Sequence, residues 1–400
     1  MKTERLARWA LLLPAAGLLA LSALTILREL GAIHPLYTPL ALAAVLAVAL
    51  AARWMGDWRW SFALLAVGAV GLRVVFVLGW TVYPHEAALS SWNLALELSG
   101  SPLGQWPALL GALGGGLDRA FVVYAAVLVR LLGPSLLAVQ LPGAVLGGLS
   151  CLMTALLALR LTGDRRAALA AGALTACCPT LLFSAGVLSG LPVYTFLLLW
   201  GLYLLAKLEE AHPWPALAAA LLIGVVFGSA VGGGSVELGG LGELVRKVRY
   251  QFGSFNYPQA RLDTGGGLRS LLIGQVMHPV LQGYMLAVLL LALAGLLIYH
   301  RERLLPAVAA LGCLAAAMVW TAEPVRNGLL IPLLATWAAR PALQAADWAL
   351  LLAAPEKKRG PLPPALAAVR LVVSVVVYGA MLALVLLFFT GEGAFLYEAF

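Results

Sequence analysis

The chain alternates between long apolar runs and short polar segments. A helix needs about 20 mostly apolar residues to cross a bilayer, and about 11 stretches come near that length. They are 8–27, 36–54, 61–82, 136–161, 167–183, 187–206, 215–233, 280–299, 304–321, 327–340 and 366–390. The pattern predicts an all-α polytopic membrane protein with about 11 transmembrane helices, within a range of roughly 10 to 12.

The composition supports this fold class. Of 400 residues, 62% are hydrophobic and 11% are charged, whereas a soluble domain has about 25% charged residues. A soluble globular protein, a disordered chain and a disulfide-stapled scaffold are therefore excluded. Cys151, Cys177, Cys178 and Cys313 all lie in apolar stretches, without a CxxC or Cys/His motif. They are predicted to be buried free thiols, and no metal-ligand set is predicted.

The basic residues set the expected orientation. The net charge is +8, and Lys and Arg are concentrated in the short loops on one side, as the positive-inside rule requires of the cytoplasmic face. That inner set includes Lys2, Arg5, Arg8, Arg53, Arg59, Arg160, Arg165, Arg166, Lys207 and Arg340. The sequence thus predicts an integral protein of a prokaryotic plasma (inner) membrane, with the N-terminus cytoplasmic and the C-terminus outside. The distribution also explains the basic balance without a nucleic-acid partner.

The spans divide the chain into three expected parts. Residues 1–60 hold two additional N-terminal transmembrane helices, 61–353 form the core, and 354–400 hold a basic cytoplasmic loop and the last helix. The two longest segments outside the spans, 83–135 and 234–279, both fall on the outer face. A functional site is therefore expected there.

The first outer loop carries a polar stripe. Glu86, Ser90, Asn93 and Glu97 fall on one side of a helix, which predicts an interfacial helix on the membrane surface with a carboxylate at its start. The wet side of any surface helix is an equally ordinary explanation of this stripe.

Two further features belong with that loop. A second interfacial helix is predicted from Asp118, as N-cap, to Leu132. Arg73 lies within a span, where an arginine is by default a functional or paired residue.

Several short motifs follow one another in an order that resembles a known family. They are His85-Glu86-Ala87, Gly133-Pro134-Ser135, Gln140-Leu141-Pro142-Gly143, Gly163-Asp164-Arg165-Arg166-Ala167-Ala168, Pro179 and Arg326-Asn327-Gly328-Leu329-Leu330-Ile331-Pro332. In order and spacing they resemble the GT-C superfamily of integral-membrane glycosyltransferases, specifically the branch of protein O-mannosyltransferases and lipid A aminoarabinose transferases. Two departures stand out: His85 replaces the family's usual acidic base, and Gln140 replaces an arginine.

The resemblance implies a GT-C-like core and a catalytic site on the outer face. The donor would be a polyprenyl-phosphate-linked sugar, with no certain cofactor and no predicted metal ligand. Glu86, or His85 oriented by Glu86, would be the catalytic base. The remaining residues expected at the substrate-binding site are Arg326, Arg73, Arg119, Asp118, Arg246, Lys247, Asn93 and Glu97. For the cations a structural alternative stays open, because Arg326 could pair with Glu323 and the 246–249 cluster could contact lipid headgroups.

Three hypotheses follow for function. The first is a membrane glycosyltransferase that moves a sugar from a polyprenyl-phosphate carrier to an acceptor on the outer face. The second is a non-catalytic GT-C-like scaffold subunit of a larger membrane complex, and the third is a transporter. The expected partners are membrane lipid, the lipid-linked sugar and, for the scaffold, protein subunits.

Overall fold

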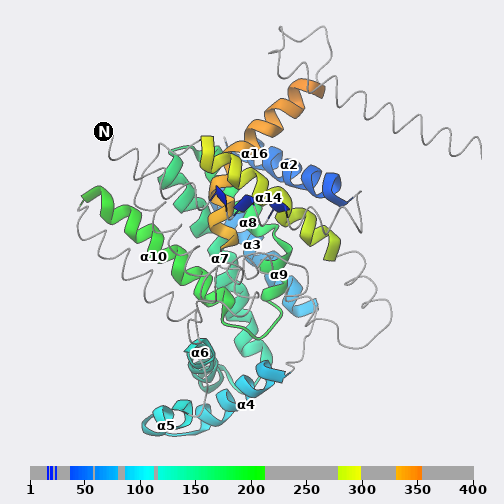
Figure 1. The fold of residues 1–400 in the computed structure, drawn as a ribbon. Helices are drawn as coiled ribbons and strands as arrows, with labels where there is room; N and C mark the ends of the chain where they lie inside the picture. The colour runs from blue at the N-terminus through cyan, green and yellow to red at the C-terminus, as the bar shows by residue number, and fades with distance from the viewer. Residues whose placement is uncertain are drawn as a thin grey trace, which may run out of the picture. The chain divides into compact units, whose positions relative to one another are not determined.

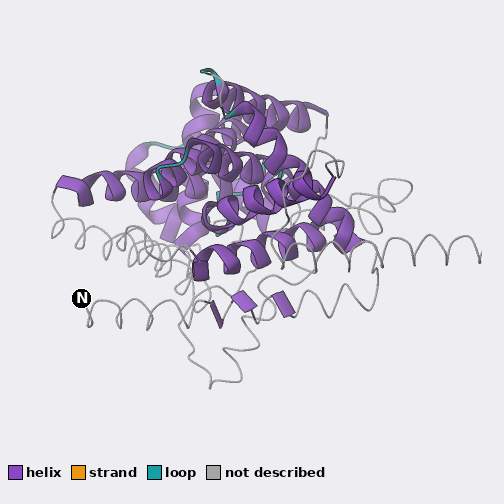
Figure 2. Cartoon of the chain, turned by 90° about the horizontal axis from the view of Figure 1, so that it is seen from above, coloured by secondary structure: helices purple, strands orange, loops and turns teal. Residues whose placement is uncertain are grey.

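The computed structural model describes residues 16–17, 19–20, 23–24, 37–56, 59–79, 86–111, 116–211, 278–298 and 330–353. Within these ranges the chain is helical, with short connecting loops and no strand (Figure 2). The helices are α2 (Tyr37–Met55), α3 (Ser61–Gly79), α4 (Glu86–Gly100), η1 (Leu103–Gln105), α5 (Trp106–Gly111), α6 (Gly116–Leu132), α7 (Leu136–Thr162), α8 (Arg165–Ala176), α9 (Pro179–Ser184), α10 (Leu191–Ala211), α14 (His278–Ile298) and α16 (Ile331–Ala353). The all-α prediction is confirmed for this part of the chain.

Among the described helices, three are long and apolar enough to span a membrane. The spans are Ser61–Gly79 in α3, Leu136–Thr162 in α7 and Leu191–Leu208 in α10. Their apolar composition supports association with a membrane. The larger predicted number of spans stays a prediction, and the stretches 215–233, 304–321 and 366–390 lie outside the described residues, as does most of 8–27.

The central span, α7, runs antiparallel to α3 and parallel to α10, since Arg160 near the end of α7 lies over Tyr203 near the end of α10. Helix α7 contacts α3 on one side and α10 on another (Figure 1). Close packing of α3 on α7 depends on Gly148, where an added Cβ would lie 2.5 Å from Val70 Cγ2 and 2.6 Å from Val70 Cα. Small residues at such positions let helix backbones approach within a membrane.

The predicted span at 167–183 is wrong, because the chain forms two shorter helices there. Helix α8 has 12 residues, about 18 Å of helix, which is too short to cross a bilayer. Asp164 caps it by accepting a hydrogen bond from the backbone N–H of Arg166 at 2.9 Å. After Cys177 and Cys178 the chain restarts at Pro179, the first residue of α9.

Helix α8 is enclosed by its neighbours. It packs against α7, α2 and α3, and at Gly172 an added Cβ would lie 2.5 Å from Leu65 and 2.9 Å from Ala155. Helix α2, from the part predicted as additional N-terminal spans, also packs against α14. The described N-terminal helix is thus packed into the bundle.

Two further expectations need correction. The span predicted to end at residue 340 continues to Ala353 as α16, with Pro341 inside the helix. Cys177 is exposed, whereas Cys151 and Cys178 are buried free thiols as expected; Cys313 lies outside the described residues. The chain separates into two compact units, Met1–Leu343 and Gln344–Phe400. The division at residues 60 and 353 stays a prediction.

Candidate functional site

Helix α4 forms the start of the predicted site and has two distinct sides. Ser90, Asn93 and Glu97 are exposed, whereas Ala95 and Leu98 are fully buried. This is the amphipathic pattern predicted for a helix along a surface. The two polar side chains assigned to the substrate site, Asn93 and Glu97, therefore face outward from the pair that α4 forms with α6.

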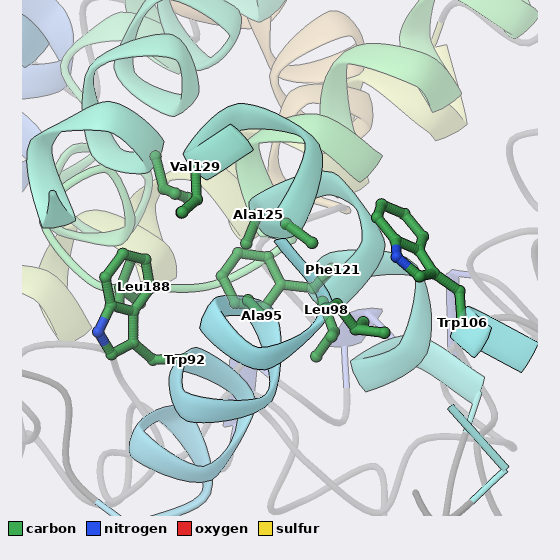
Figure 3. Close-up of a cluster of buried hydrophobic side chains, with 11 residues drawn as sticks. Trp92, Ala95, Leu98, Trp106, Phe121, Ala125, Val129 and Leu188 are labelled. Atoms are coloured by element: carbon green, nitrogen blue, oxygen red, sulfur yellow. The ribbon is translucent and has the colours of Figure 1, made fainter. Parts of the chain in front are cut away.

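A cluster of apolar side chains holds α4 against α6 (Figure 3). Phe121 lies in the middle of the cluster, with Trp92 on one side and Trp106 on the other. Val139 from α7 and Leu188 belong to the same cluster. The α4–α6 pair is thus packed onto the end of the bundle at which α7 begins.

The pair also contains one buried polar atom of note. The hydroxyl of Tyr124 in α6 is buried and has no hydrogen-bond partner among the described residues. Burial raises the pKa of Tyr124 to about 12, because the charged phenolate loses hydration. This tyrosine is protonated at physiological pH.

Arg73 lies in the interior of the bundle, with no exposed surface. Its Nη1 donates to the carbonyl of Ala69 at 3.2 Å and its Nη2 to the carbonyl of Thr175 at 3.5 Å. Its side chain passes against Gly147, where an added Cβ would lie 3.3 Å from Cδ and from Nε. Nε has no hydrogen-bond partner within the described ranges.

The acceptor of Arg73 belongs to the end of a helix. Thr175 lies in the last turn of α8, whose final carbonyls lack partners within the helix. The hydroxyl of Tyr284, in α14, donates to the carbonyl of Leu174, the residue that precedes Thr175. Arg73 and Tyr284 therefore cap the end of α8 inside the bundle, and the helix dipole favours the cation at that position.

A buried turn connects α9 to α10 near the beginning of α7. Gln140 is 3% exposed, and its Nε2 donates to the carbonyl of Gly186 at 2.8 Å. Gly186 lies against Phe76 of α3: a Cβ added at Gly186 would be 2.8 Å from Cε1 of Phe76. Non-helical backbone in a membrane protein must be enclosed by protein or line a water-filled cavity. Gln140 supplies one hydrogen bond to this turn.

Three buried polar atoms, on α7, on α9 and in the turn before α10, have no hydrogen-bond partner in the part of the chain that the structure describes. They are Oε1 of Gln140, Oγ1 of Thr180 and Oγ of Ser189. Thr180 and Ser189 were not predicted as site residues, since a lone hydroxyl in an apolar run gives no sequence signal. Buried polar groups without a protein partner are typical positions for bound water or ligand.

The remaining predicted residues are placed in part. Glu86 is the first residue of α4, and Asp118 and Arg119 lie in the first turn of α6, but their side chains are not described. Because α6 begins at Gly116, the prediction of Asp118 as N-cap is wrong. His85, Arg246, Lys247 and Arg326 lie outside the described residues. The structure thus brings Asn93 and Glu97 together on α4 and places Arg73 apart from them in the bundle.

The described part of the chain holds no group of three or more His, Cys, Asp or Glu arranged to bind a metal ion. No family model, curated protein or solved structure matches the chain.

Proposed function

We propose that the chain is a membrane glycosyltransferase of the GT-C type, which moves a sugar from a polyprenyl-phosphate carrier to an acceptor on the outer face of a prokaryotic plasma membrane. One observation carries the proposal: α4 begins at Glu86, seven residues after the spanning helix α3 ends at Gly79. An acidic residue is therefore the first residue of the helix that follows a span, the position in the chain expected for a base that serves a lipid-linked donor.

The proposed chemistry divides between the two expected groups. Glu86, or His85 oriented by it, removes the proton of the acceptor hydroxyl. The acceptor oxygen then forms a bond to the anomeric carbon while the bond from that carbon to the carrier phosphate breaks. Arg326, Arg119 and the pair Arg246-Lys247 stabilise the phosphate that leaves, since a forked guanidinium suits its oxygens.

The first test identifies the lipid that the protein carries. The full chain is purified in mild detergent, its lipids are extracted, and their masses are measured. A polyprenyl phosphate or its glycosylated form is expected. The proposal would be contradicted if repeated preparations contained no such lipid and the folded protein also failed to bind added polyprenyl phosphate.

The second test addresses Glu86. Glu86→Gln removes the base but keeps the size of the side chain, so it should abolish transfer from the bound carrier while the protein still inserts and folds. Ser90→Ala, one turn further along the exposed side of α4, is the matched control and should retain transfer. Full activity of Glu86→Gln would remove this residue from the mechanism.

A non-catalytic scaffold remains the second proposal, and the interior of the bundle favours it. Arg73 and Gln140 donate to backbone carbonyls, so both are engaged in holding helices and turns. Co-purification with stoichiometric protein subunits and no carrier lipid would support this role over the enzyme.

A further inference from the structure

Seven basic residues of the predicted inner set, all within the described ranges, lie at one end of the bundle. Arg165, in the first turn of α8, donates to the hydroxyl of Ser61 at 3.1 Å and to the carbonyl of Arg59 at 3.3 Å. Its guanidinium also lies over the ring of Phe62, 5.6 Å from the centroid. The start of α8 is thereby joined to the start of α3.

Contacts extend the same cluster across the neighbouring helices. Arg340 donates to the carbonyl of Thr162, the last residue of α7. Arg160 lies over the ring of Tyr203 in α10, 5.8 Å from the centroid. An added Cβ at Gly56, just beyond α2, would lie 2.6 Å from Cγ of Arg166. The basic cluster comprises Arg53, Arg59, Arg160, Arg165, Arg166, Lys207 and Arg340.

This end of the bundle coincides with the edge of the apolar spans. Helix α3 begins at Ser61, α7 ends at Thr162, and the apolar part of α10 ends at Leu208. Trp54 and Trp60 are 69% and 70% exposed beside the cluster. Exposed tryptophans at the ends of spans are typical of the layer of lipid headgroups.

The basic side chains of the cluster reach the surface. Arg59, Arg165, Arg166 and Lys207 are exposed, and Arg53, Arg160 and Arg340 are partly exposed. The carboxylate of Asp164 accepts the backbone N–H of Arg166 as a helix cap. Cations gathered at the edge of a membrane attract anionic lipid headgroups, with about 1 kcal/mol for each Lys or Arg near the surface.

From these contacts we infer that the basic cluster is a binding site for the phosphate of an anionic phospholipid, held against the turn between α7 and α8. The guanidinium groups of Arg59, Arg165 and Arg166 supply forked donors to the phosphate oxygens. Trp54 and Trp60 lie at the level of the headgroup, beside the bound phosphate. The site is independent of the proposed catalytic function, because it involves none of the residues expected to act on the sugar.

The experiment measures lipid binding by the full chain in detergent. Phosphatidylglycerol, phosphatidylcholine and inorganic phosphate are titrated separately, and binding is followed by native mass spectrometry and by the midpoint of thermal unfolding. Phosphatidylglycerol is expected to bind and raise the midpoint, with an affinity that falls as salt is added. Equal binding of phosphatidylcholine would overturn the inference. An equal effect of inorganic phosphate would assign the site to a free anion instead of a lipid.

Variants locate the site. Arg59→Gln with Arg166→Gln should weaken phosphatidylglycerol binding roughly 10- to 30-fold, from about 1 kcal/mol for each lost cation. Arg59→Lys with Arg166→Lys should retain most of the binding and shows that the positions tolerate substitution. Arg130→Gln, on α6 within the α4–α6 pair, is the control and should bind as the unaltered chain does. Unchanged affinity in the Gln pair, or an equal loss in Arg130→Gln, would refute the assignment. If the Gln pair does not fold, a wild-type affinity insensitive to salt refutes it equally.

Discussion

Nη2 of Arg73 lies 3.5 Å from the carbonyl oxygen of Thr175, 102 residues further along the chain. Arg73 is 12 residues into α3 and Thr175 is 10 residues into α8, and both helices begin at the basic end of the bundle. Each atom is therefore about 15–18 Å from that end. The pairing sets the guanidinium of Arg73 against the partial negative charge at the end of a helix.

Replacement of Arg73 distinguishes a structural role from a substrate-binding role. Arg73→Met introduces an apolar side chain of similar length. It removes a hydrogen-bond donor from the carbonyls of Ala69 and Thr175, so it should lower the free energy of unfolding by about 1–2 kcal/mol. Arg73→Ala should lower it by about 3 kcal/mol, because a cavity is added. The measurement is thermal unfolding in detergent. A stable Arg73→Met protein without transfer activity would instead assign Arg73 to the substrate.

The close contact at Gly148 predicts a large effect of one methyl group. Gly148→Ala would bring Cβ against the backbone of Val70, so α3 and α7 must separate, with an expected loss of about 1–3 kcal/mol. Gly143→Ala is the matched control in the same helix, since its Cβ would meet nothing within 4 Å. That variant should be neutral or gain up to about 1 kcal/mol in helix propensity. Similar unfolding midpoints for the two variants would contradict this packing.

The raised pKa of Tyr124 predicts that the protein loses stability at alkaline pH. The unfolded state ionises near the ordinary pKa of 10.0, whereas the folded state does so at about 12. Below pH 10 Tyr124 is protonated in both states, and its contribution to the free energy of unfolding is fully present. As the pH rises from about 10 to 12, the unfolded state loses the proton first, so this contribution is lost. Chemical unfolding of the unaltered chain and of Tyr124→Phe should diverge over this interval. Parallel curves would show that the hydroxyl ionises as freely in the folded protein.

The cluster between α4 and α6 can be tested at Trp92. Trp92→Ala should destabilise the pair by about 3 kcal/mol, because a nearly buried ring is lost from the cluster. Leu103→Ala should change stability by no more than about 0.5 kcal/mol, since Leu103 is 67% exposed. Limited trypsin cleavage at Arg130 reports opening of the pair and should accelerate only in the first variant. If the Trp92→Ala and Leu103→Ala variants were cleaved at equal rates, the ring of Trp92 would not be what stabilises the pair.

The sequence predicted the helices whose apolar runs and polar stripes are regular. The spans in α3, α7 and α10 follow from length and hydropathy. The outward side of α4 follows from the spacing of Ser90, Asn93 and Glu97. Leu89 of the same helix is 43% exposed, so the pattern of polar residues alone does not tell which apolar side chains of α4 the packing covers.

Tertiary hydrogen bonds account for much of what the sequence did not reveal. Residues 167–183 are apolar throughout, so hydropathy alone gave no reason for α8 to stop at Ala176. The partner of Arg73 is a backbone carbonyl, which any residue type provides. Gln140 was noted as a departure from a motif, but its bond to Gly186 depends on how a distant turn folds back.

The termination of α8 also bears on how the chain is made. Helix α8 has 12 residues, too few to span a bilayer, and the carbonyls of Thr175 and Leu174 at its end accept from side chains of α3 and α14. Arg73 is synthesised before α8, but Tyr284 emerges from the ribosome 110 residues after Leu174. During biogenesis, the nascent protein must therefore shelter an incomplete helix end until its last donor arrives.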